Sequence, residues 1–113
     1  MPTELNPYRQ TLLDFYLRLP DTPRRLSRHE LGLVRQLWER EVPLRIVEAA
    51  FLLASARRGA RRPDAMPLQP IRSLHYFVPV LEELITQPLP ESYVAYLRSK
   101  VQMRPVTQAA AAP

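Results

Sequence analysis

The chain has no cysteine and only two glycines among its 113 residues. The absence of cysteine excludes disulfides, thiolate metal sites and a cysteine nucleophile. The longest apolar run, residues 49–54, is far shorter than the roughly 20 residues that a membrane-spanning helix needs. No basic region followed by an apolar run marks a signal peptide at the N-terminus. We therefore expect a cytoplasmic protein with no membrane partner.

Patterns typical of catalysis or metal binding are missing too. The only two histidines, His29 and His75, lie far apart in the sequence and do not form a ligand spacing such as His-x-x-x-His. The adjacent carboxylates Glu82 and Glu83 would not face the same point on a helix. No glycine-rich phosphate loop and no nucleophile elbow occurs. The sequence thus predicts no enzyme activity, no metal, no cofactor and no small-molecule substrate.

What the chain does contain is a series of helical patterns separated by prolines. Apolar residues recur at three- and four-residue spacing, and no alternating β-branched run is joined to an Asn-Gly or Asp-Gly turn. We predict an all-α fold, a small bundle of about five helices that forms a single domain over residues 1–104. A proline-marked loop is expected at 59–72, and a disordered Ala/Pro tail at 105–113.

The helix limits follow from caps and prolines. Ser27 and Glu30 have the spacing of a capping box, in which each side chain accepts a hydrogen bond from the other residue's backbone. Pro79 lies inside an apolar segment, which must either kink or begin a fresh helix after a short first turn. The predicted helices run from Asn6 to before Pro20, from Ser27 to about Arg40, from Pro43 to about Arg58, from Ser73 to a break at Gln87, and from Pro90 or Glu91 to about Met103.

Arginine dominates the charge of the chain. The formal net charge is +5, and 15 of the 16 basic residues are arginine. Such a balance favours an acidic partner: nucleic acid, an anionic membrane surface or an acidic protein. Because alanine and proline are abundant as well, a GC-rich coding bias also explains part of the arginine, and a merely solvated basic surface remains the alternative. Four guanidinium groups within residues 57–62 repel one another, and Asp64 is the only acid near them in sequence.

The position of these arginines suggests a binding surface. They begin at the end of the third predicted helix and lead through the loop towards Tyr76, which could stack on a base. The other tyrosines and Trp38 fall on apolar stripes and are expected in the core. We therefore predict a DNA-binding surface that contacts phosphates without sequence preference. Its predicted members are Arg57, Arg58, Arg61, Arg62, Arg72 and Tyr76, with Arg24, Arg25 and Arg28 extending it.

A second hypothesis needs no nucleic acid. The chain is short for its number of apolar helix faces, so one of them could dock on a protein partner or on a second copy of the chain. Tyr93, Tyr96 and Leu97 of the last predicted helix are the candidates for this contact. The protein would then be an adaptor or a homodimeric helical module.

A series of motifs runs through residues 8–85: Phe15-Tyr16, Leu26-Ser27 with Glu30, Leu37-Trp38, Val47-Glu48-Ala49-Ala50, and Ile71-Arg72-Ser73-Leu74-His75-Tyr76-Phe77 with Val80 and Leu84. In this order they resemble the small helical domain of DnaD-type primosomal and phage replication-initiation proteins. In that family a Tyr-x-x-x-Ile-x-x-x-Trp stretch is associated with DNA binding. The matching positions here are Tyr76, Val80 and Leu84. The resemblance implies a helical module of DNA replication or of a mobile element.

Overall fold

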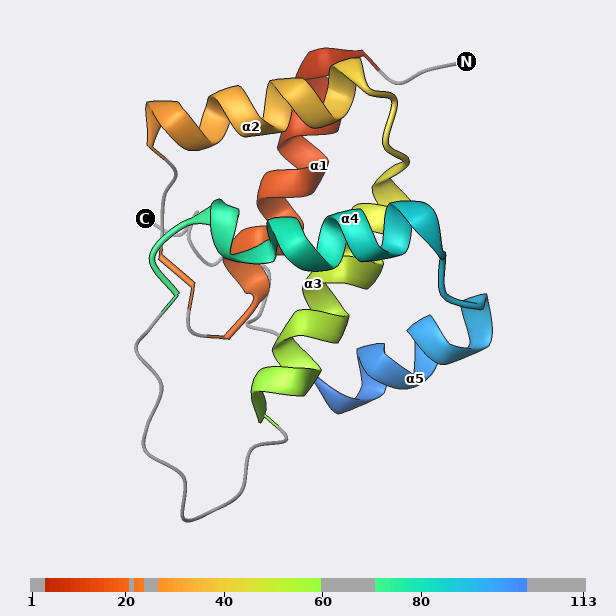
Figure 1. Cartoon of the computed structure of the whole chain (residues 1–113). Helices are drawn as coiled ribbons and strands as arrows, with labels where there is room; N and C mark the ends of the chain where they lie inside the picture. Colours follow the sequence, from red (N-terminus) through yellow and green to blue (C-terminus); the bar gives the residue numbers. More distant parts are fainter. Residues whose placement is uncertain (1–3, 21, 24–26, 60–70, 102–113) are drawn as a thin grey trace.

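The computed structural model describes residues 4–20, 22–23, 27–59 and 71–101. Within these ranges the chain forms α-helices and one 3-10 turn and no β-strand, which confirms the all-α class (Figure 1). None of the helices in these ranges has the length and hydropathy needed to cross a lipid bilayer. The elements are α1 (Leu5–Arg18), α2 (Arg28–Glu39), α3 (Leu44–Gly59), η1 (Leu74–Phe77), α4 (Val78–Thr86) and α5 (Glu91–Lys100).

Helix α3 is the centre of the bundle. It contacts α1, α4, α5 and η1, and α4 crosses it in Figure 1. A helix that is enclosed by neighbours on several sides needs apolar or small residues around most of its circumference. This is the composition that predicted a central helix here. Its buried residues are Ile46, Val47, Ala49, Ala50, Phe51, Leu52, Leu53, Ala54 and Ser55.

Three aromatic rings join α1, α3 and η1 in the core. The ring of Phe77 lies 4.8 Å from that of Phe51 and 6.0 Å from that of Tyr16, centroid to centroid. All three side chains are almost fully buried. Tilted and edge-on contacts of this kind stabilise a core beyond the burial of area alone. The cluster fixes η1 against the first and third helices.

Glu30 links the start of α2 to η1. The predicted capping box is present: Ser27 N–H donates to Glu30 Oε1 at 2.7 Å, and Glu30 N–H donates to Ser27 Oγ at 3.4 Å. The second carboxylate oxygen, Oε2, accepts a hydrogen bond from Leu74 N–H at 2.6 Å. Glu30 is only 4% exposed. One buried carboxylate therefore holds together two segments that are 44 residues apart.

The segment around Pro79 begins a fresh helix after a short first turn, which is the second of the two expected outcomes. Ser73 Oγ accepts a hydrogen bond from His75 N–H and caps the short turn η1. Helix α4 then begins afresh at Val78, with Pro79 in its first turn. Proline is tolerated there because an amide in the first turn has no partner within the helix.

The start of α1 differs from the prediction. The helix begins at Leu5, and Glu4 rather than Asn6 occupies the N-cap position. Asn6 is instead inside the first turn, where its Oδ1 accepts a hydrogen bond from Arg9 at 2.8 Å. Two residues further on, the hydroxyl of Tyr8 donates to the carbonyl of Val42 at 2.8 Å, and burial raises the pKa of Tyr8 to about 12.

Candidate functional site

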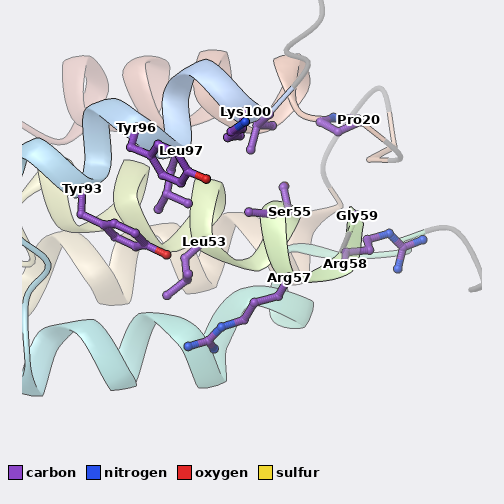
Figure 2. Close-up of a pocket in the computed structure, with 12 residues that line it drawn as sticks. Pro20, Leu53, Ser55, Arg57, Arg58, Gly59, Tyr93, Tyr96, Leu97 and Lys100 are labelled. Carbon is purple, nitrogen blue, oxygen red and sulfur yellow. The ribbon is translucent and has the colours of Figure 1, made fainter. Parts of the chain in front are cut away.

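A groove of about 750 Å³ lies between the C-terminal half of α3 and helix α5 (Figure 2). Leu53 of α3 and Leu97 of α5 give it apolar walls. Arg57 and Arg58 line it from the end of α3, and Lys100 lines it from the end of α5. The groove thus combines an apolar interior with cations, which suits an anionic ligand that carries a flat or apolar part.

Two tyrosines of α5 form an exposed stack in this groove. Tyr93 and Tyr96 are 42% and 52% exposed, and their rings lie 5.8 Å apart with planes inclined by 24°. The ammonium of Lys100 lies 5.5 Å from the centroid of the Tyr96 ring. A cation over an aromatic face gains a modest electrostatic attraction at such an exposed site. The groove therefore presents aromatic surface and positive charge together.

The expectation that these two tyrosines belong to the core is wrong. The buried residues of α5 are Val94 and Leu97, followed by Val101 after the helix end. These aliphatic residues recur at three- and four-residue spacing and pack towards α3, so Tyr93 and Tyr96 lie beside the buried stripe. The spacing of these aliphatic residues in the sequence could have identified the buried face of α5. It was overlooked because the large tyrosine side chains were expected in the core.

Arg57 has a partner that the sequence did not indicate. Its two terminal nitrogens donate to the two carboxylate oxygens of Glu83 on α4, at 3.0 and 2.8 Å. This hydrogen bonding raises the pKa of Arg57 and lowers the pKa of Glu83. Asp64 is thus not the only acid available to the arginine cluster. Both side chains are about half exposed, and such surface pairs contribute little to stability.

Arg58 and Tyr76 are brought together, as their roles in the predicted surface require. The guanidinium carbon of Arg58 lies 5.7 Å from the centroid of the Tyr76 ring, and Tyr76 is 43% exposed. The same ring contacts Phe77 edge-on, at 5.2 Å. The end of α3 is therefore flanked by exposed tyrosines from two other elements: Tyr76 from η1 beside Arg58, and Tyr93 from α5 in the groove with Arg57.

The structure describes only some of the remaining predicted site residues. Arg72 is exposed just before η1, and Arg28 is exposed in the first turn of α2. Neither forms an ion pair within the part of the chain that the structure describes. Arg24, Arg25, Arg61 and Arg62 lie outside the described residues. Of the positions that carry the family resemblance in this region, Tyr76 is exposed, whereas Leu84 is a core residue at 1% exposure.

Polar atoms other than the cations give the site little chemistry. Ser55 lines the groove, but its Oγ is buried and has no hydrogen-bond partner among the described residues. His29 and His75 are both exposed. No group of three potential metal ligands occurs within the described ranges. The arrangement is one that could bind a ligand through charge, stacking and apolar contact.

Comparison with known proteins does not add a relative to this picture. No family model, no curated protein and no solved structure matches the chain.

Proposed function

We propose that this chain is a small cytoplasmic DNA-associated domain that binds the phosphate backbone without sequence preference. The observation that carries the proposal is the end of α3, where Arg57 and Arg58 are flanked by exposed tyrosines of η1 and α5. Arginine contacts to phosphate supply affinity, and exposed aromatic rings add stacking that tolerates any base. On the family resemblance, the DNA would be that of a replicating chromosome, a phage or another mobile element.

The pairing of Arg57 with Glu83 is compatible with this role. The geometry is bidentate, which is also how a guanidinium binds phosphate. Because the pair is exposed and contributes little to stability, a phosphate can replace the carboxylate at small cost. Glu83 then acts as an internal competitor that weakens binding to anions.

Removing the cluster should reduce both affinity and its salt dependence. The fourfold variant Arg57→Ala, Arg58→Ala, Arg61→Ala and Arg62→Ala should bind DNA at least about tenfold more weakly at low salt. On a duplex, the slope of log K against log salt should become shallower by about 0.9 for each phosphate that the variant no longer neutralises. Fluorescence anisotropy with a labelled oligonucleotide across a salt series measures both. The corresponding fourfold lysine variant is the control, since it keeps the charge. Unchanged binding by the alanine variant would refute this assignment of the site.

Removing the internal competitor should have the opposite effect. Glu83→Gln frees Arg57, and we expect DNA binding at low salt to tighten about threefold, an effect on the scale of an exposed ion pair. Glu82→Gln is a matched control, because it removes the same charge from the neighbouring position of α4. Its partner is Arg40, which follows α2 and does not line the groove. Equal tightening by the two variants would show that only net charge matters.

A second candidate function is supported by the exposed tyrosine pair of α5. Tyrosine is enriched at protein interfaces, so Tyr93 and Tyr96 could contact a protein partner or a second copy of the chain. Size-exclusion chromatography with light scattering, with and without DNA, separates the two functions. A stable dimer that has no affinity for DNA at low salt would favour the adaptor.

A further inference from the structure

We infer that the groove between α3 and α5 is a binding site for unpaired bases, so that the protein prefers single-stranded to double-stranded nucleic acid. The inference rests on the proposed function and adds the form of nucleic acid and the place at which its bases stack. Its evidence is the exposed stack of Tyr93 and Tyr96 beside an apolar wall and three cations. Arginines alone would bind the phosphates of either form.

The aromatic pair explains why the preference is for single strands. Bases in a duplex are already stacked and paired, so their faces are not available to a protein side chain. Unpaired bases stack on exposed aromatic rings, and each such contact is sequence-tolerant because every base has a flat face. Tyr93 and Tyr96 leave about half of their surface accessible, and their rings point into the groove from the same helix face (Figure 2).

Aromatic rings and positive charge fit the two parts of a nucleotide. Leu53 and Leu97 line the groove beside the tyrosines but are only 7% and 2% exposed, so the surface open to a base is mainly that of the tyrosine rings. Lys100 offers positive charge to a phosphate from the end of α5, whereas Arg57 lines the groove from α3 with its guanidinium directed to Glu83 on α4 and becomes available once a phosphate replaces that carboxylate. A volume of about 750 Å³ lies within the range of small-ligand sites. The contact of Lys100 with the Tyr96 ring is exposed and can be exchanged for a phosphate.

The test compares a labelled oligothymidine with a labelled duplex of equal length, at one salt concentration, by fluorescence anisotropy. Wild-type protein should bind the single strand more tightly. Tyr93→Ala with Tyr96→Ala should weaken single-strand binding about five- to hundredfold and leave duplex binding within about twofold. Tyr93→Phe with Tyr96→Phe should keep the preference, because phenylalanine keeps the ring. Circular dichroism establishes that each variant has kept its helices.

Other outcomes separate this inference from the proposed function. No binding of either nucleic acid at low salt would refute the proposed function itself. Tight binding of both forms, unaffected by the double alanine variant, would refute only the stacking site. A loss of preference in Tyr76→Ala instead would place stacking at η1 and overturn the assignment to the groove. A dimer that dissociates in the double alanine variant would show that the groove is occupied by a second copy, which also overturns it.

Discussion

Replacing Phe77 by alanine should destabilise the domain by about 3–5 kcal/mol, a large fraction of the roughly 5–15 kcal/mol that holds a typical domain folded. The side chain has no exposed surface and contacts both Phe51 and Tyr16. Its removal leaves a cavity where α1, α3 and η1 meet. Urea unfolding followed by circular dichroism measures the change in the free energy of unfolding.

The neighbouring residue provides the control for this prediction. Tyr76 is an aromatic residue of the same 3-10 turn, but 43% of its surface is exposed. Tyr76→Ala should therefore cost about 1 kcal/mol or less, because it opens no cavity in the core. If the two variants were equally stable, the aromatic cluster would not be the connection between η1 and the bundle.

Local signals explain how much of the fold could be predicted. The capping box of Ser27 and Glu30 and the fresh start at Pro79 each depend on a few neighbouring residues, and both are present. The all-round apolar character of α3 correctly indicated a central helix. The predicted start of α1 was wrong because the cap is set by backbone conformation at Glu4, not by which nearby residue has the best capping side chain.

The candidate site depended on long-range contacts that a sequence pattern does not contain. The side chain of Arg57 donates a hydrogen bond to Glu83, 26 residues away in the sequence, and that of Arg98 donates one to Glu48, 50 residues away. The sequence placed Arg58 and Tyr76 in one surface, and the structure brings them together. The groove with α5 was not predicted, since its tyrosines were assigned to the core or to a protein contact.

The second large effect on stability is expected from removing the hydrogen bond between Glu30 and the Leu74 amide. Glu30→Ala should destabilise the domain by about 2–5 kcal/mol, because the amides of Ser27 and Leu74 both lose their acceptor. The Leu74 amide is the more important of the two, since this hydrogen bond is buried. The buried hydroxyl of Tyr16 lies near the same carboxylate: burial raises the pKa of Tyr16, and the charge of Glu30 raises it further.

Two conservative variants separate the cap from the long-range contact. Ser27→Ala removes only the hydroxyl of the capping box and should cost about 1 kcal/mol. Glu30→Gln keeps one carbonyl oxygen and turns the other position into a donor, so one of the two amides must lose its acceptor; its cost should fall between those of Ser27→Ala and Glu30→Ala. Hydrogen exchange at the Leu74 amide should become faster in Glu30→Ala than in Ser27→Ala. Equal costs for Glu30→Ala and Ser27→Ala would mean that Glu30 acts only as a helix cap, and that η1 is held in place by its apolar contacts alone.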